Sequence, residues 1–304
     1  MMKLLEELCA VRATSGDEGK MTEFILDYVV QESPNWKVKP EVFSGPGFQD
    51  CVVLSFGKPA TAIFAHIDSI GFTVSYNNSL IKIGGPKVTH GIQLVGSDSQ
   101  GEIAGSLITE DDGSIKIEFH RNIERGTTLT FKPEFRETSK SVQCCYLDNR
   151  LGVYVALEVA KTLENGLIVF SCLEEHGGGA VGFLSDFITS RYSVYQALIC
   201  DITWVTEGVI PGKGVAISMR DGLIPRRSYV KRIIELAKES GISFQLEVES
   251  AGGSDGSEIQ KSIFPIDWCF IGAPEKHVHS PDEWVNKNDI QSMIKLYSYL
   301  LEFL

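Results

Sequence analysis

Long apolar segments are missing from this sequence. Its 304 residues contain no hydrophobic run of the roughly 20 residues that a membrane-spanning helix requires. Glu6 and Glu7 interrupt the first apolar stretch, and no extended apolar region is followed by a small-residue cleavage site, so no secretory signal is expected. We therefore expect a cytoplasmic protein with no membrane partner.

Positive charge is also scarce. Lys and Arg total 28 against 40 Asp and Glu, which gives a formal net charge of −12. We expect no nucleic-acid partner, because phosphates require a basic surface. The acidic surface agrees weakly with cationic peptides, since its field would steer them toward the protein.

Cysteine patterns that indicate a structural metal site are absent. The seven cysteines include no CxxC pair, and an odd number cannot all pair with one another. Reduced and mostly buried thiols are therefore expected. The sequence also has no internal repeat and no low-complexity segment.

Strand-like and helix-like patterns alternate over much of the chain, whose composition is that of an ordinary globular protein. Ser15 and Glu18 have the spacing of a capping box, which predicts that a helix begins there. Further helices are predicted at 149–163, 179–188, 227–241 and 289–304, and strands at 49–57, 60–68, 166–173, 195–200 and 265–271. The alternation predicts an α/β fold with a mainly parallel sheet flanked by helices on both faces.

The middle of the chain has a different pattern. From about residue 76 to 142, short alternating strands follow one another without a long helix, and Asp112-Gly113 predicts the turn of a hairpin. We interpret 76–142 as a small all-β domain inserted into a main domain formed by residues 1–75 and 143–304.

Side chains that commonly bind metals follow several of the predicted strands. They are His66, Asp68, Asp148, Glu174, Glu175, Asp201, His277 and His279. Any one of them has a simpler explanation, such as a helix cap for Asp148 or a hydrogen-bonded core imidazole for His66. Ligands bind beyond the carboxyl ends of strands in open α/β sheets, however, and converging carboxylates repel one another unless cations neutralise them. Carboxylates and imidazoles without thiolates suit zinc, cobalt or manganese in a hydrolytic site.

Six motifs occur in a fixed order along the chain: AHIDSIGF, LDNRLG, LEEHGGGA, CDIT, GGSDG and HVHSPDEW. This series resembles that of the co-catalytic dimetal aminopeptidases, which include glutamyl aminopeptidase and the tetrahedral aminopeptidases. The resemblance covers essentially the whole chain. It implies a zinc-peptidase-like fold and hydrolysis of the N-terminal bond of short peptides, with two bridged divalent ions, zinc or cobalt most readily and manganese as an alternative.

The resemblance also implies a ligand set. Carried over by position, it makes Asp148 the carboxylate that bridges the two metals. His66 and Asp201 would complete one metal site, and Glu175 and His279 would complete the other. A bidentate carboxylate is the side chain that can span two ions about 3.5–4 Å apart while partly neutralising both.

Two further roles and three departures come from the same resemblance. Glu174 would be the general base for the attacking water, and Asp68 would orient the His66 imidazole. Ser69 replaces an acidic residue of the family pattern, Lys276-His277 replaces an Arg-Tyr pair, and the two glutamates are followed by His176 and three glycines. These departures put the substrate preference in doubt without removing a ligand, and His277 is interpreted as the replacement of an aromatic residue.

In the resembled family the inserted domain forms a lid and a dimerisation module. Residues 76–142 match its position, so we expect this role and a homo-oligomer, either a dimer or a dodecamer.

Three other interpretations remain open at this stage. Gly177, Gly179 and Gly182 satisfy the GxGxxG fingerprint of nucleotide-binding proteins, with Asp201 about twenty residues further on. The two glutamates just before these glycines would oppose a pyrophosphate. A dimetal deacylase acting on acylated amino acids would use the same ligands, and a non-catalytic relative would be an assembly or peptide-binding module.

Overall fold

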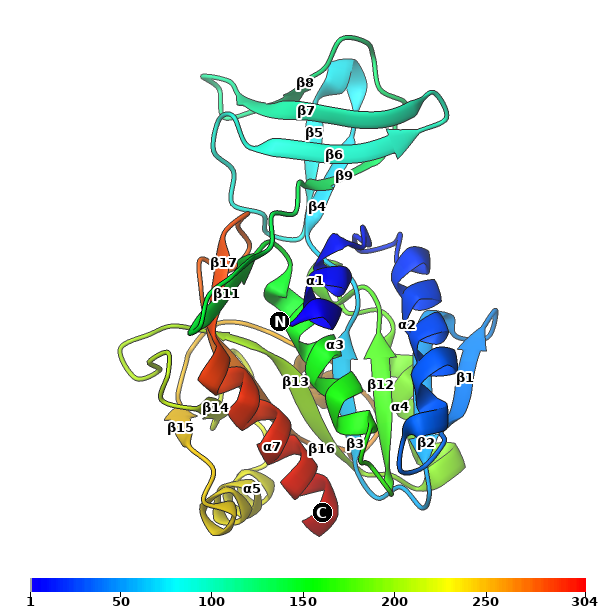
Figure 1. Cartoon of the computed structure of the whole chain (residues 1–304), viewed down its shortest axis with the longest axis vertical. Helices are drawn as coiled ribbons and strands as arrows, with labels where there is room; N and C mark the ends of the chain where they lie inside the picture. The colour runs from blue at the N-terminus through cyan, green and yellow to red at the C-terminus, as the bar shows by residue number, and fades with distance from the viewer. Residues whose placement is uncertain (1) are drawn as a thin grey trace.

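A mixed sheet of eleven strands forms the body of the computed structural model, which describes residues 2–304 (Figure 1). Its four central strands run parallel and are, in spatial order, β12 (Gly166–Ser171), β3 (Ala62–His66), β13 (Gln196–Trp204) and β16 (Asp267–Lys276). These strands are almost entirely buried and rich in Ile, Val, Phe and Ala, as expected where helices cover both faces of a parallel sheet.

The outer strands make the sheet mixed. They are β1 (Glu41–Gly45), β2 (Gln49–Phe56), β10 (Arg136–Glu137), β11 (Ser141–Cys144), β14 (Val215–Ser218), β15 (Phe244–Glu247) and β17 (Glu283–Asn286). β14 pairs with β15 in parallel, and the other outer pairings are antiparallel. The predicted α/β fold is confirmed, with its parallel strands at the centre of the sheet.

Helices lie on both faces of the large sheet. Figure 1 shows α1 (Lys3–Ala10), α2 (Gly19–Glu32), α3 (Leu147–Ala160) and α7 (Lys287–Phe303) in front of it and α4 (Val181–Tyr192) behind it. The short α6 (Asp255–Lys261) packs against α4, and α5 (Arg227–Ser240) packs against α7. α3 is buried along nearly its whole length because it packs against α1, α7 and the sheet. α5 ends at Gly241, which has φ +68° in the left-handed region, as its sequence predicts.

The predicted capping box near the N-terminus is wrong. α2 begins at Gly19, one residue after Glu18, and no side chain caps it. The Ser15 hydroxyl instead donates to Asp68 Oδ2 at 2.6 Å. Glu18 accepts the backbone N–H groups of Gly16 and Leu173. Both side chains thus bind segments beside the candidate site, and this competes with local capping.

A second, antiparallel sheet of six strands lies at one end of the molecule (Figure 1). Its strands are β4 (Gly71–Val74), β5 (Leu80–Ile83), β6 (Gln93–Asp98), β7 (Gly101–Thr109), β8 (Ile115–Glu118) and β9 (Thr128–Phe131). The predicted hairpin around Gly113 is confirmed by the pairing of Thr109 with Ile115. We call these six strands the small sheet. β10 and β11 follow it in the chain and join the large sheet.

All seven cysteines are free and buried, as predicted. Within residues 2–304, no helix combines the length and the apolar character needed to cross a bilayer.

Candidate metal centre

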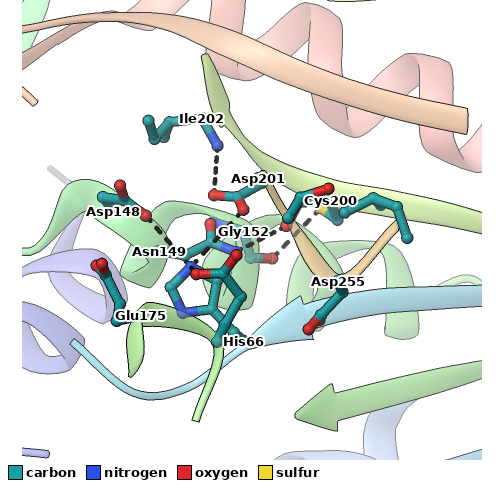
Figure 2. Close-up of polar contacts among 12 residues, drawn as sticks. His66, Asp148, Asn149, Gly152, Glu175, Cys200, Asp201, Ile202 and Asp255 are labelled. Carbon is teal, nitrogen blue, oxygen red and sulfur yellow. Dashed lines mark hydrogen bonds and ion pairs between the residues drawn. The ribbon is translucent and has the colours of Figure 1, made fainter. Parts of the chain in front are cut away.

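The candidate site lies at the carboxyl ends of neighbouring parallel strands. β3 ends at His66, which lies in register beside Ser171 of β12. β13 pairs with the other edge of β3 and carries Asp201. Figure 2 shows the side chains of His66, Asp148 and Asp201 gathered at this edge. The large sheet therefore places the predicted residues where open α/β sheets bind ligands.

The first group of potential metal ligands consists of His66, Asp148 and Asp201, and all three are buried. His66 Nε2 lies 3.2 Å from Asp148 Oδ1 and 3.6 Å from Asp201 Oδ2. One ligand atom from each residue lies within 4.8 Å of the others. An imidazole and two carboxylates at these separations can surround one cation.

The second group consists of Asp148, Glu175 and His279. His279 Nε2 lies 3.2 Å from Asp148 Oδ2 and 3.2 Å from Glu175 Oε2. Asp148 belongs to both groups, and its two oxygens face different imidazoles: Oδ1 faces His66 and Oδ2 faces His279. This is the arrangement that a carboxylate shared by two cations requires.

Asp68 connects the first group to the loop that carries the two glutamates. Its Oδ1 lies 3.3 Å from His66 Nδ1, on the side of the ring away from the group. Its oxygens also accept the backbone N–H groups of Glu174 and Glu175, each at 3.1 Å. Burial opposes ionisation, but His66 and the Ser15 hydroxyl hold the pKa of Asp68 below its usual value. Asp68 is thus placed to orient an imidazole and a loop together.

Strong upward pKa shifts occur in the two groups and at the neighbouring Glu174. Burial raises the pKa of Glu174, and the nearby Asp201 raises it further. Burial also raises the pKa of Asp201, with an added contribution from Asp148. Although burial opposes charge on His279, Asp148 and Glu175 raise its pKa to about 11. Without metal ions, protons on these carboxyl groups and imidazoles reduce the repulsion between the buried negative charges. Divalent ions would replace those protons.

An unsatisfied oxygen supports the same interpretation. Glu175 Oε1 is buried and has no hydrogen-bond partner within residues 2–304. A buried carboxylate oxygen of this kind is unfavourable unless a ligand binds it. The donor set therefore fits divalent cations bound by oxygen and nitrogen atoms.

Glu283 is a functional candidate that the sequence analysis did not identify. It is fully buried, and its Oε2 accepts the backbone N–H of Asp148 at 3.2 Å. Its Oε1 accepts the backbone N–H of His279 at 2.8 Å. The Glu283 side chain thus holds the backbones of Asp148 and His279, which are more than a hundred residues apart in the sequence. Glu283 lies within HVHSPDEW, but the motif does not reveal which of its two acids turns inward.

Asp255 was also missed, although the GGSDG motif contains it. It is buried near the first group (Figure 2). Ser171 donates a hydrogen bond to its Oδ2. Its Oδ1 has no hydrogen-bond partner within the described residues. Burial raises the pKa of Asp255 to about 6. This carboxyl adds to the negative charge near the candidate site.

A loop after β5 reaches the second group. The Gly85 carbonyl lies 3.3 Å from His279 Nδ1, and the Lys87 N–H donates to the His279 carbonyl at 2.8 Å. The Gly84 N–H donates to His176 Nδ1 at 3.1 Å. We call residues 84–87 the site loop. A hydrogen bond from His279 Nδ1 to Gly85 leaves Nε2 free to face the carboxylates.

The residues that depart from the resembled family lie outside both groups. Ser69 is buried, and its hydroxyl donates to the Ala13 carbonyl at 3.1 Å. The Lys276 ammonium lies 5.1 Å from the centre of the Trp284 ring. His277 is exposed and belongs to neither group.

The position of Asp201 disagrees with the nucleotide-binding interpretation. Asp201, which would contact a ribose in that interpretation, lies instead with His66 and Asp148.

A cavity of about 280 Å³ opens beside the candidate site. Asp148, Glu174, Glu175, Asp201 and His279 line one part of it. Glu174 Oε2 lies 3.9 Å from His66 Nε2, so this carboxylate faces the first group from the cavity. The volume is near the lower end of ordinary ligand pockets, which suits a small substrate or the end of a chain.

Comparisons with known proteins agree with this arrangement. The sequence model of the M42 glutamyl aminopeptidase family matches residues 113–296. A candidate aminopeptidase of Acetivibrio thermocellus is 24% identical over 339 residues, covering 97% of each chain. The structure of an aminopeptidase from the archaeon Desulfurococcus kamchatkensis superposes with a TM-score of 0.88 at 21% identity, covering 100% of this chain and 94% of that one.

A second solved structure is that of the TET1 peptidase of Pyrococcus horikoshii, which can assemble into a tetrahedron or a large octahedral shell. It has a TM-score of 0.83 at 22% identity, with 99% of each chain covered. The family match extends over more than half of the sequence and includes four of the five predicted ligands. The chain therefore belongs to the M42 glutamyl aminopeptidase family, whose members hydrolyse peptide bonds.

Proposed function

We propose that this protein is a metal-dependent aminopeptidase that removes the N-terminal residue of short peptides by means of two divalent ions. The observation that carries this proposal is the position of Asp148, whose two oxygens face two separate groups of ligand side chains. Family membership supports the aminopeptidase activity. The small cavity favours the free end of a peptide over the surface of a folded protein.

The proposed ligands are the five residues of the two groups. His66 and Asp201 would hold one ion, Glu175 and His279 would hold the other, and Asp148 would hold both. When bound, divalent ions of this type polarise a carbonyl group and lower the pKa of water. Zinc or cobalt suits the mixed nitrogen and oxygen donors, and manganese is the alternative.

Glu174 is the proposed general base. Its carboxylate lines the cavity and is not needed in either ligand group. Its raised pKa suits a group that accepts a proton from the attacking water and returns it to the leaving amine. Asp68 would keep His66 in its ligating orientation, and Glu283 would hold the backbone of Asp148 and His279.

We also propose a homo-oligomer, a dimer or a dodecamer, in which residues 76–142 act as a lid and dimerisation module. The assemblies of the Pyrococcus horikoshii peptidase support this proposal. The small sheet is suitably placed at one end of the molecule, away from most of the large sheet (Figure 1). The cytoplasmic location stays a prediction.

The test of the proposed function is Asp148→Ala. This variant should lose both ions and the hydrolysis of amino-acid p-nitroanilides, because the shared carboxylate allows two dications to bind side by side. Metal content per chain and turnover would be measured after chelation and re-addition of zinc, cobalt or manganese. Asp112→Ala, in the exposed turn of the hairpin, is the matched control and should keep both properties.

Two results would contradict the proposal. Two tightly bound ions in Asp148→Ala would show that Asp148 is not the bridge. Faster hydrolysis of N-acetylated substrates than of free aminoacyl substrates would assign the site to the deacylase alternative.

A further inference from the structure

We propose that the cavity selects substrates whose N-terminal residue has a long cationic side chain, lysine or arginine. This inference rests on the proposed function and concerns the part of the cavity that lies beyond the ligand groups. It differs from the preference for glutamate that the family's name indicates.

The cavity contains three acidic residues in addition to the proposed ligands and base. Asp221, Glu247 and Glu249 line it together with Thr203, Trp204 and Phe270. Among the residues that line the cavity, none is a lysine or an arginine. An acidic substrate side chain would be repelled here, and a basic one would be attracted.

Glu247 is the most informative of these acids. It is only 3% exposed, yet it lines the cavity. The Thr203 hydroxyl donates to its Oε1, but within residues 2–304 no cationic side chain forms an ion pair with it. A buried carboxylate is unfavourable without a countercharge. Glu247 lines the cavity, and a cationic ligand bound there can supply that charge.

The position of Glu247 matches the length of a basic side chain. Thr203 and Asp201 are two residues apart on β13, so their side chains leave the strand on the same face, roughly 6.6 Å apart. Glu247 accepts a hydrogen bond from Thr203. Its carboxylate therefore lies about the length of one lysine or arginine side chain from the ligand groups. The four-carbon stem of lysine can reach it while the scissile carbonyl lies at the ligand groups. The substrate's α-amino group lies too close to that carbonyl to do so.

Apolar walls suit the stem of such a side chain. Trp204 and Phe270 both line the cavity. Gly252 has φ +93° and lies beside the Trp204 ring, since a Cβ added there would be in ordinary contact with it at 3.6 Å. Lysine and arginine bury their methylene groups on such surfaces while the charged end finds a polar partner.

Arg220 does not supply the missing countercharge. Its Nε donates to the backbone carbonyls of Asp221 and Glu249 at 3.2 and 3.1 Å. It does not line the cavity. The guanidinium thus holds together the backbones of the two segments that carry the acids and donates no hydrogen bond to their carboxylates.

Lysyl and norleucyl p-nitroanilides give the most direct test, because norleucine keeps the unbranched carbon stem and lacks the ammonium group. In the metal-loaded protein, kcat/KM should be about 10- to 100-fold higher for the lysyl substrate, which corresponds to one hydrogen-bonded charge pair. The glutamyl substrate should be slowest. Glu247→Gln should reduce the lysyl-to-norleucyl ratio about tenfold or more. Glu239→Gln removes the same charge from an exposed position on α5 and should leave the ratio unchanged.

Glu249→Gln serves as a second variant if Glu247→Gln does not fold, and it should lower the ratio in the same direction. Equal kcat/KM values for lysyl and norleucyl substrates would overturn the inference and leave the proposed function intact. If no aminoacyl substrate were hydrolysed, the proposed function would fail. Calorimetric binding of lysinamide against norleucinamide would then decide the inference: tighter lysinamide binding that depends on Glu247 supports it, and equal binding overturns it.

Discussion

Acidic side chains have opposite surroundings in the two sheets. In the small sheet, Asp98 accepts hydrogen bonds from both terminal nitrogens of Arg121, at 2.6 and 2.7 Å, and this pairing holds its pKa well below the usual value. At the edge of the large sheet, acids line a cavity whose lining includes no lysine or arginine, and burial raises the pKa of Glu174 and Asp201. An acid with its own guanidinium stabilises the fold, whereas a buried acid without a cation marks a place where one binds.

Among variants that keep both ions, the largest effect on turnover should come from Glu174→Gln. The amide can still form hydrogen bonds but cannot accept a proton, so turnover should fall by roughly 10²–10⁴-fold, the usual contribution of a general base. Both metal ions should remain bound. Glu175→Gln should instead weaken the second ion site, because a neutral amide oxygen replaces a charged ligand, and added zinc or cobalt should restore part of its activity.

Metal content and turnover of both glutamate variants, followed through a metal titration, distinguish these outcomes. If added metal restored the turnover of Glu174→Gln but not that of Glu175→Gln, Glu174 would be the metal ligand and Glu175 the general base. Full activity in both variants would contradict the dimetal interpretation as a whole.

A smaller effect should follow from Gly84→Ala, which tests the contact between the two sheets. Gly84 has φ +65°, and a Cβ there would lie 2.8 Å from Ile70 Cγ2 and 3.1 Å from the Glu175 carbonyl, so the site loop would have to move. The neighbouring Gly85 would then hold His279 less well. Metal affinity of the second ion site should weaken by roughly tenfold, the lower end of the effect of losing an orienting partner.

Gly113→Ala is the matched control for the site loop. Gly113 has φ +82° in the hairpin turn, and a Cβ there would meet nothing within 4 Å. It therefore imposes a similar backbone strain without any contact with the site. The two variants would be compared by competition with a metal-binding dye, and equal metal affinities would show that the site loop does not orient His279.

The smallest effect on activity is expected for Asp98→Asn. Because the folded-state pKa of Asp98 is lowered, its ion pair stabilises the protein above the unfolded-state pKa, and this contribution is lost as the pH falls through the folded-state pKa. The variant should unfold at a lower temperature than the parent at pH 7, and the difference should shrink below about pH 5. Its kcat/KM at pH 7 should change less than about twofold. A large loss of activity without a change in unfolding temperature would contradict this division between the sheets.

Much of the fold follows from local patterns in the sequence. The helix that ends at Gly241 and the hairpin around Gly113 were predictable because a positive φ favours glycine at these positions. The position of His66 at the end of β3 followed from an apolar run that stops at a polar side chain, whereas β13 continues past Asp201 to Trp204. The ordered motifs then indicated which residues share a site, and the structure brings all five proposed ligands together.

The missed features depend on contacts between distant segments. Ser15 has the spacing of a cap, but its hydroxyl binds Asp68, which lies 53 residues further on. Glu283 acts on backbone N–H groups, and any residue except proline can supply such a donor, so no side-chain pattern identifies its partners. The contact of the Gly85 carbonyl with His279 could not be predicted either, because every residue has a backbone carbonyl.

The contact between Gly85 and His279 joins segments 194 residues apart, and it has a consequence for the order in which the protein is made. A ribosome releases the small sheet early and His279 close to the end of translation. Contacts of such long sequence separation form late, since the intervening chain must first be available. A nascent or prematurely terminated chain that ends before His279 lacks a ligand of the second group, whatever else has folded. The complete centre can therefore form only after nearly the whole polypeptide has been synthesised.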